Sequence, residues 1–429
     1  MTRSGPADDG LRLKPFHGVR YVPERVGSLS AVTSPPYDVV VRPDGLRHLE
    51  TADPHNIVRL ILPQADSAAD RNRRAADTLR RWLDEGVLAT DPRPALYVYE
   101  QRSEDVLQRG LIGALRLSPA EAGVVLPHED VMAEVVADRA ALMRETAANL
   151  EPLLLSYRGG ESGQGADAVV ERAVQRIPLL STVTEDGFRH RLWSVSDPAE
   201  LAEVEDDLAG RQALIADGHH RWATYLRLWE EHPADSVPWG YGLVLLVDSA
   251  RYPLQVKAIH RLLRGLPTDT ALSALGGAFR TRRLDGDLDR ALEALALASR
   301  EQSGNAFVLA GADGAFHLLD QPDQTLIKRV VPEERPEAWR TLDATVLHSV
   351  LLEHLWHIPD SPEHIGYIHD AAAAVEQARL HGGTAVLMHP VREEVVRELA
   401  QQGVTMPRKS TSFGPKPATG LVLRSLRLE

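Results

Sequence analysis

A run of five residues, Asp217-Gly218-His219-His220-Arg221, concentrates more potential chemistry than any other segment of the sequence. The apolar residues just before it predict a short buried strand, and the amphipathic pattern just after it predicts a helix. A helix N-terminus offers backbone N–H groups and the positive end of the helix dipole to an anion. Gly218 would let a ligand approach the backbone closely, while His219, His220 and Arg221 supply side-chain donors. We therefore expect an anion-binding loop, and phosphate is the anion that fits it best.

The carboxylate of Asp217 is out of place in a site built only for anions. It could hold Mg²⁺ beside a phosphate, act as a base toward a hydroxyl, or cap the following helix. His220 is a second candidate for catalysis in the same loop. A purely structural interpretation has Asp217 as the cap, one histidine filling the helix–strand junction, and Arg221 paired with an acid. Zinc binding is a further alternative, although histidines at i and i+1 rarely converge on one metal and no third ligand is evident.

A basic loop near the C-terminus, residues 406–420, is the second candidate for anion binding. Only five of the 48 basic residues are lysines, and two of the five lie in this loop beside a row of hydroxyl groups. Positive charge next to hydroxyls suits a polyanion, and a loop framed by glycine and proline suits a lid that closes over it. The alternative is a solvated surface loop whose lysines serve solubility. The residues expected to contact phosphate here are Arg408, Lys409, Ser410, Thr411 and Lys416.

Clustered acids precede another predicted helix. His128-Glu129-Asp130 follows Pro127, and such a group could bind Mg²⁺ or provide a general base. Glu129 is the candidate base or metal ligand, alone or together with Asp217. A surface turn ahead of a helix explains the same residues as well.

Two further groups are secondary candidates. Lys257, His260 and Arg261 form a second basic point, which could serve a phosphate or be polar residues on an exposed face. Tyr37 and Asp38 follow two prolines, which force a bent or extended backbone and would present both side chains from a rigid turn.

Short strands alternate with helices along the chain, which predicts an α/β fold, with a mixed α+β arrangement as the alternative. A helix over 70–85, a β-hairpin from strands beginning at Ala95 and Gly110, and a helix over 137–150 precede the loop at Asp217. The predicted divisions are a disordered tail at 1–12, an N-terminal α/β region at 13–160, a central region with the loop at 161–335 and a C-terminal region with the basic loop at 336–429.

The amino-acid composition excludes several kinds of functional site and partner. The sequence contains no cysteine, which excludes disulfides, thiolate metal sites and cysteine nucleophiles. The net charge of −13 argues against a general nucleic-acid surface, although a local basic site remains open. Neither a signal peptide nor a membrane-spanning apolar run is evident, so we expect a cytoplasmic protein without a membrane partner. The sequence does not determine the oligomeric state.

A series of short motifs extends over nearly the whole chain after the first twelve residues. These are PFHGVRY, PPYDVV, PHED, DRAALM, AANLEPLL, IADGHHRWAT, IHRLL and MPRKSTSFGPKPATGLV. In wording and order they resemble the domain-of-unknown-function 1015 family of bacteria and archaea. Membership of that family implies no established activity.

The DGHHR loop with its helix also resembles the phosphate-binding loop of the ParB/sulfiredoxin-like superfamily, which includes nucleotide-dependent free serine kinases. This resemblance covers about a dozen residues and implies a ParB/sulfiredoxin-like core around the loop. It implies that Gly218, His219, His220 and Arg221 contact nucleotide phosphates, with a nearby carboxylate as base for an acceptor hydroxyl. The lack of cysteine excludes sulfiredoxin chemistry itself, and no partition-protein DNA-binding region aligns.

Two functions follow as expectations. The first is phosphoryl transfer from ATP or ADP, with Mg²⁺, to the hydroxyl of a small metabolite such as a serine-like amino acid. This chemistry needs mainly positioning and charge neutralisation, which the loop and the lysines could supply. The alternative is a nucleotide- or phosphate-responsive binding or regulatory protein that uses the same loop without turnover. Small molecules and nucleotides, not nucleic acid, are the expected partners.

Overall fold

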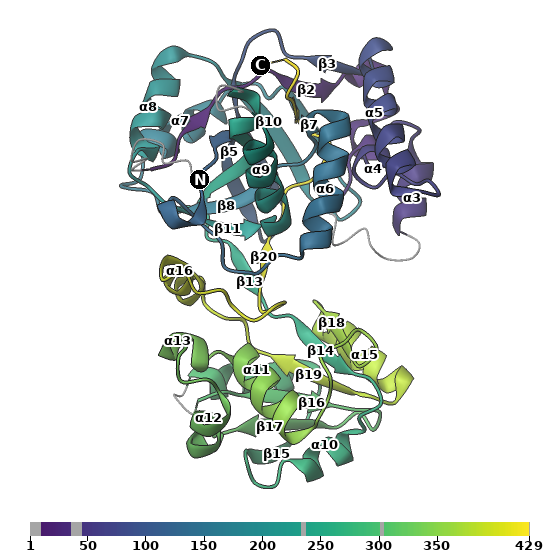
Figure 1. The fold of residues 1–429 in the computed structure, drawn as a ribbon, viewed down its shortest axis with the longest axis vertical. Helices are drawn as coiled ribbons and strands as arrows, with labels where there is room; N and C mark the ends of the chain where they lie inside the picture. The colour runs from purple at the N-terminus through teal and green to yellow at the C-terminus, as the bar shows by residue number, and fades with distance from the viewer. Residues whose placement is uncertain (1–9, 36–44, 233–236, 301–303, 429) are drawn as a thin grey trace. The chain divides into compact units, whose positions relative to one another are not determined.

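A computed structural model describes residues 10–35, 45–232, 237–300 and 304–428 of the chain. The chain divides into two compact units. Unit 1 comprises Met1–Leu254 with Pro415–Glu429, and unit 2 comprises Gln255–Gly414. Both units combine helices with β-sheets, so the expected mixed α/β class is confirmed (Figure 1). In the described residues no helix has both the length and the apolar character needed to cross a membrane.

Unit 1 is built on a nine-stranded sheet of mixed direction. Two pairs, β6 with β11 and β8 with β12, are parallel, and the other neighbours are antiparallel. The predicted β4–β5 hairpin is confirmed, with Tyr97 opposite Ile112. In spatial order the strands are β6 (Val125–Leu126), β11 (Ala213–Asp217), β8 (Leu153–Tyr157), β12 (Tyr241–Asp248), β5 (Leu107–Arg116), β4 (Leu96–Arg102), β10 (Arg189–Val195) and β9 (Leu180–Val183), with β1 (Leu13–Lys14) beside β5.

Helices and a small second sheet complete unit 1. The helix α6 packs against both α9 and α5 (Figure 1). The longer helices are α5 (Ala68–Asp84), α6 (Ala133–Thr146), α7 (Gly165–Ala173), α8 (Pro198–Leu208) and α9 (His219–Glu231). The shorter ones are α1 (Leu29–Val32), α3 (Gly45–Ala52) and α4 (Val58–Ile61), and the small sheet has the order β3 (Leu88–Thr90), β2 (Gly18–Tyr21), β21 (Leu423–Ser425) and β7 (Ala148–Asn149).

Unit 2 contains a six-stranded sheet in which every pair is antiparallel. Its strands are β15 (Arg280–Leu284), β17 (Phe316–Asp320), β16 (Phe307–Ala310), β19 (Thr384–Met388), β14 (His260–Leu263) and β18 (Ile365–Ile368). Its helices are α10 (Thr268–Ala274), α11 (Leu288–Arg300), α12 (Gln324–Val330), α13 (Glu337–Arg340), α14 (Asp343–Val346), a π-helix at Leu347–Leu355, α15 (Ala371–His381) and α16 (Glu393–Gln401). A separate ribbon pairs β13 (Gln255–Lys257) with β20 (Ser412–Gly414).

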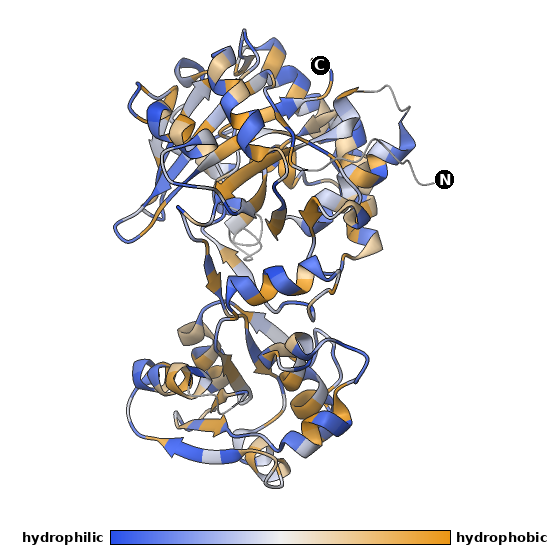
Figure 2. Cartoon of the chain, turned by 90° about the vertical axis from the view of Figure 1, so that its left-hand side faces the viewer, coloured by the Kyte–Doolittle hydropathy of each residue, from blue (hydrophilic) through white to orange (hydrophobic). Residues whose placement is uncertain are grey.

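Each unit has its own hydrophobic core. In unit 1 the strands around β11 are buried together with Trp222 and Tyr225 of α9. In unit 2 the core gathers around Phe307, Leu347 and Val386. Within each unit the hydrophobic colour concentrates on the strands, while the helices carry both colours (Figure 2). This pattern is expected when one face of each helix covers a sheet.

The division expected at residues 160 and 335 does not coincide with these units. The strand β8 lies before residue 160 and pairs with β11 and β12, which lie after it. Likewise β14 lies before residue 335 and pairs with β18 and β19, which lie after it. Hydrogen-bonded ladders therefore cross both expected boundaries, and local composition could not indicate these long-range pairings.

Candidate anion-binding site

The loop at Asp217 joins β11 directly to α9, as predicted. Gly218 is the N-cap residue of α9, with φ of 104°, and as a glycine it has no side chain with which to cap the helix. A Cβ on Gly218 would lie 2.8 Å from Leu153 Cγ, so both the backbone conformation and the space require glycine. The alternative in which Asp217 caps the helix is therefore wrong. The positive end of the α9 dipole lies beside the loop.

Asp217 is held between two cations. Its Oδ1 lies 2.8 Å from Lys416 Nζ, and its Oδ2 accepts a hydrogen bond of 2.6 Å from Arg221 Nη2. Burial alone would raise the pKa of Asp217, but the charges of Lys416 and Arg221 outweigh it and lower the pKa from 3.8 to about 2. The carboxylate is therefore ionised at neutral pH. Such a group is a weak base, which suits a metal ligand or counterion better than a proton acceptor.

The two histidines of the loop bind the main chain of the segment that contains Glu129. His219 Nε2 accepts from the backbone N–H of His128 at 3.2 Å, and His220 Nε2 accepts from that of Met132 at 3.1 Å. Since β6 and β11 are parallel neighbours, the segment after β6 and the loop after β11 emerge at one edge of the sheet. Both ends of the segment 128–132 are thereby fixed to the start of α9, and Glu129 lies between them.

The buried histidines are neutral at pH 7. Burial lowers the pKa of His219 to about 4, and burial together with His219 lowers the pKa of His128 well below its ordinary value. The two rings meet edge to face with centroids 4.4 Å apart. Because Nε2 of His219 accepts a bond, the proton of its neutral ring lies on Nδ1. His219 can therefore offer a ligand a neutral donor but not a positive charge.

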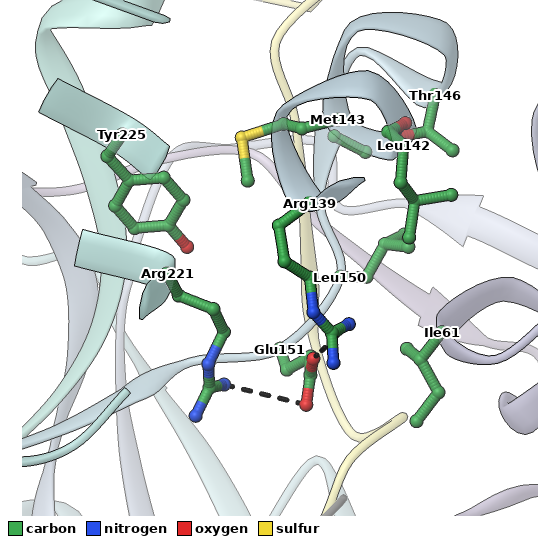
Figure 3. A pocket seen from close by; sticks show the side chains of 10 residues that line it. Ile61, Arg139, Leu142, Met143, Thr146, Leu150, Glu151, Arg221 and Tyr225 are labelled. Carbon is green, nitrogen blue, oxygen red and sulfur yellow. Dashed lines mark hydrogen bonds and ion pairs between the residues drawn. The ribbon is translucent and has the colours of Figure 1, made fainter. Parts of the chain in front are cut away.

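Arg221 also borders a pocket on its other side. Its Nη1 donates to the carbonyl oxygen of Pro152 at 3.0 Å and lies 3.5 Å from Glu151 Oε2, while Arg139 Nη1 lies 3.8 Å from Glu151 Oε1. Figure 3 shows both guanidinium groups directed at Glu151. The pocket holds about 370 Å³ of empty space, part of it open to solvent. Its lining is Ile61, Arg139, Leu142, Met143, Thr146, Ala148, Leu150, Glu151, Arg221 and Tyr225.

Sequence reasoning missed Glu151. The available signal was a single acid inside the apolar stretch 148–155, directly before Pro152. Such an isolated acid is unusual in a buried segment, because ionised side chains are rarely buried without partners. Glu151 is only 7% exposed.

The basic loop is divided between the two units. Lys416 belongs to unit 1 and reaches Asp217, whereas Arg408, Lys409, Ser410 and Thr411 belong to unit 2. Within unit 2, Lys409 has a left-handed backbone with φ of 57°, and the Ser410 hydroxyl donates to the carbonyl of Pro407. The expected role of these four residues in phosphate binding stays a prediction.

The second basic point also lies in unit 2. Arg261 is fully buried, donates to the carbonyl of Lys409 at 3.0 Å and lies over the Tyr367 ring. His260 is buried as well, and its Nδ1 accepts from the backbone N–H of Met388 at 3.2 Å. Burial lowers the pKa of Arg261 to about 10 and that of His260 to about 4. The interpretation as an exposed polar face therefore holds for Lys257 alone.

Tyr37 and Asp38 lie outside the described residues.

Asp217 and Glu129 are the carboxylates of the site that could hold a metal ion. Within the described ranges no group of three or more His, Asp or Glu side chains could enclose a metal ion. Zinc needs such a set of protein ligands. Mg²⁺ is usually held by one or two carboxylates together with water and phosphate oxygens, and Asp217 with Glu129 could supply the carboxylates.

The chain has a mixed α/β architecture with a strand–loop–helix site, and its family can now be stated. The family described as "Protein of unknown function (DUF1015)" matches residues 13–345. The chain belongs to that family, as its motifs predicted. A search of curated proteins found no match.

Three of the solved structures that are similar to this chain are the following. A free serine kinase mutant in complex with ADP is 14% identical, with a TM-score of 0.35, and the match covers 72% of this chain and 89% of that chain. SbnI from Staphylococcus aureus with a C-terminal truncation is 10% identical, with a TM-score of 0.34 and coverage of 71% and 82%. A conserved hypothetical protein from Pyrococcus furiosus is 15% identical, with a TM-score of 0.33 and coverage of 71% and 94%. TM-scores this low carry no argument about the chemistry of this chain.

Proposed function

We propose that this protein transfers a phosphoryl group from ATP or ADP to the hydroxyl of a small metabolite, and that the loop Asp217–Arg221 holds the phosphates. One observation carries the proposal. The carboxylate of Asp217 is bound by Lys416 and Arg221 at the start of α9, whose N-cap residue is Gly218, so two cations and a helix N-terminus converge on one negatively charged oxygen pair. Phosphate oxygens have the charge and the acceptor geometry to take the place of that carboxylate.

Each residue then has a definite task. Lys416 and Arg221 neutralise charge on the phosphates, and His219 can donate a neutral N–H. Asp217 and Glu129 are the residues that would hold Mg²⁺, which when bound supplies charge neutralisation and orientation of the phosphate oxygens.

The reaction itself is a displacement at phosphorus. The acceptor oxygen forms a bond to the terminal phosphorus of the nucleotide while the bond from phosphorus to the bridging oxygen breaks, and that electron pair leaves on the nucleotide. The proton of the acceptor hydroxyl passes to a base of the site, for which Asp217, Glu129 and His220 are the candidates. Asp217, with its pKa of about 2, is poorly suited to take it, so Glu129 is the better candidate of these two acids. His220, whose Nε2 already accepts a main-chain N–H, is the third candidate.

The test is direct. Purified full-length protein is incubated with ATP or ADP, Mg²⁺ and a pool of small hydroxy metabolites, and phosphorus NMR follows the nucleotide and any new phosphate ester. We expect conversion, and a loss of at least tenfold in Lys416→Met. Lys328→Met, which removes a lysine exposed on α12, is the matched control and should retain the wild-type rate.

Two results would contradict phosphoryl transfer. Stabilisation of the protein by nucleotide without conversion of any pool member would instead identify a nucleotide-responsive binding protein. Conversion at equal rates in Lys416→Met and in the control would show that the loop is not the phosphate site.

A further inference from the structure

Lys416 lies on a short segment that two side chains of the strand β4 hold in place. The backbone carbonyl of Pro415 accepts a hydrogen bond of 3.0 Å from Gln101 Nε2. The backbone N–H of Ala418 donates to the Tyr99 hydroxyl at 3.2 Å. Tyr99 and Gln101 are two positions apart on β4, so their side chains lie on one face of the sheet. Lys416 therefore has one anchor directly before it and another two residues after it.

The backbone between the two anchors has little freedom to move. Lys416 lies between Pro415 and Pro417, and each proline ring fixes its own φ and restricts the residue before it. A shift of an anchor would therefore be passed on to Lys416 and not absorbed by the backbone beside it. The contact of 2.8 Å between Lys416 Nζ and Asp217 Oδ1 depends on close, well-aligned geometry, as every charge-assisted hydrogen bond does.

A chain of hydrogen bonds orients the Tyr99 hydroxyl. Thr184 gives its only hydroxyl proton to the carboxylate of Asp186 at 2.5 Å, so it accepts from His190 Nε2 at 2.9 Å. Burial lowers the pKa of His190 to about 4, and the Nδ1 of its neutral ring is then an acceptor. It takes the proton of the Tyr99 hydroxyl at 2.8 Å, a shorter distance than the 3.4 Å to Gln101 Oε1. The lone pairs of the Tyr99 oxygen are thereby left to accept from the main chain.

We propose that Tyr99 and Gln101 are positioning residues, which hold Lys416 at the distance where it binds Asp217. Both side chains are buried. Without the Tyr99 hydroxyl the N–H of Ala418 would lose its acceptor, and a buried donor gains free energy by moving to another one. That movement would carry Lys416 away from Asp217. The role of the two residues in phosphate binding rests on the proposed function, whereas their hold on Lys416 does not.

The reactivity of Lys416 tests its position without nucleotide. The chain has only five lysines, so brief acetylation of the full-length protein with acetic anhydride, followed by mass spectrometry, gives a rate for each one. Only the uncharged amine reacts, and a carboxylate at hydrogen-bond distance stabilises the charged form. We expect Tyr99→Phe and Gln101→Leu each to raise the rate at Lys416 about fivefold relative to the exposed Lys328 of the same molecule.

Tyr97→Phe is the matched control. Tyr97 is another buried tyrosine of β4, and its hydroxyl donates to Asp91 at 2.7 Å. Its loss removes a hydrogen bond of the same type and should leave the rate at Lys416 unchanged. Equal rates in the wild type, Tyr99→Phe and Gln101→Leu would overturn the proposal. A rise of the same size in Tyr97→Phe would overturn it as well, because a general loss of stability would then explain the effect.

Turnover connects the positioning residues to the proposed function. If Lys416 neutralises phosphate, Tyr99→Phe should lower kcat/KM for the nucleotide about fivefold, and should lower it no further in protein that already carries Lys416→Met. An equal loss in both backgrounds would show that Tyr99 does not act through Lys416, and would overturn the proposal.

The two assays separate this inference from the proposed function. If the wild type converts no nucleotide but the acetylation rates change as expected, phosphoryl transfer fails and the positioning of Lys416 stands. If nucleotide is converted but the acetylation rate at Lys416 is the same in all variants, phosphoryl transfer stands and the positioning role fails.

Discussion

The ion pair between Lys416 and Asp217 should contribute measurably to the stability of unit 1. We consider Lys416→Met, which keeps the aliphatic stem and removes the charge. The pKa of Asp217 falls from 3.8 to about 2, and at about 1.4 kcal/mol per pKa unit this corresponds to about 2 kcal/mol of stabilisation at pH 7. Lys416 shares this effect with Arg221, so we expect its removal to cost roughly 1 to 2 kcal/mol in the free energy of unfolding.

The pH dependence of this stabilisation follows from the direction in which the pKa of Asp217 is shifted. A carboxylate whose pKa is lowered in the folded state stabilises the protein above its unfolded pKa, because only the unfolded chain takes up the proton as the pH falls. The contribution of Asp217 is therefore complete above about pH 4 and lost as the pH falls toward 2. The difference between wild type and Lys416→Met should shrink over the same window.

Urea unfolding followed by tryptophan fluorescence provides the assay, since Trp222 lies buried on α9 next to the loop. A double-mutant cycle of Lys416→Met with Asp217→Asn should give a coupling free energy of roughly 1 to 2 kcal/mol at pH 7 and less at pH 3. Lys328→Met controls for the change in net charge. A coupling below about 0.3 kcal/mol at pH 7, or one that does not change with pH, would refute the assigned pairing.

Two further predictions concern the same loop. His219 has a pKa of about 4 in the folded state because it is buried, so its neutral form adds stability above about pH 6.5 that is lost as the pH falls toward 4. His219→Gln should remove this pH-dependent contribution to the free energy of unfolding, which is about 3 kcal/mol at most. An unchanged pH dependence of the urea midpoint would contradict this prediction. Gly218→Ala should cost roughly 1 to 3 kcal/mol through strain and the contact with Leu153, as measured by urea unfolding. Gly163→Ala is the control, because Gly163 also has a positive φ but a Cβ there would meet open space. An equal loss in the free energy of unfolding in Gly163→Ala would show that the contact with Leu153 does not contribute.

Local patterns predicted much of the fold around the site. The strand, loop and helix at 213–231 lie where the apolar run and the helical period placed them. The β4–β5 hairpin and the helix α5, which ends at Asp84 before Gly86, were equally visible. In each case the signal lies within one short segment, so no knowledge of distant contacts is needed.

Contacts between distant segments set the limit of sequence prediction. The helix expected over 137–150 ends at Thr146, because Ala147 is left-handed and β7 follows. Asn149 then accepts bonds from Leu243 N–H and from Arg424, two partners from elsewhere in the chain. Helical propensity is a local property and does not depend on such distant partners, so tertiary pairing overrides it.

The candidate site shows the same limit. The attraction of an anion to the Asp217 loop was predicted from residue types alone, but the partnership of Lys416 with Asp217 was not, because the basic loop was interpreted as one lid. Glu151 lies between two arginines, one from α6 and one from α9. Only the fold brings these three residues to one pocket wall.

The low pKa of Asp217 also constrains how the proposed site would use phosphate. Without ligand, Asp217 neutralises Lys416 and Arg221, which satisfies two partly buried cations. A phosphate that takes over these cations leaves behind a carboxylate that stays ionised at pH 7. Two anions would then share one site, which is unfavourable unless a further cation joins them. Phosphate binding at this loop should therefore be coupled to a divalent cation, and this coupling gives Asp217 a reason to stand in a site that otherwise attracts anions.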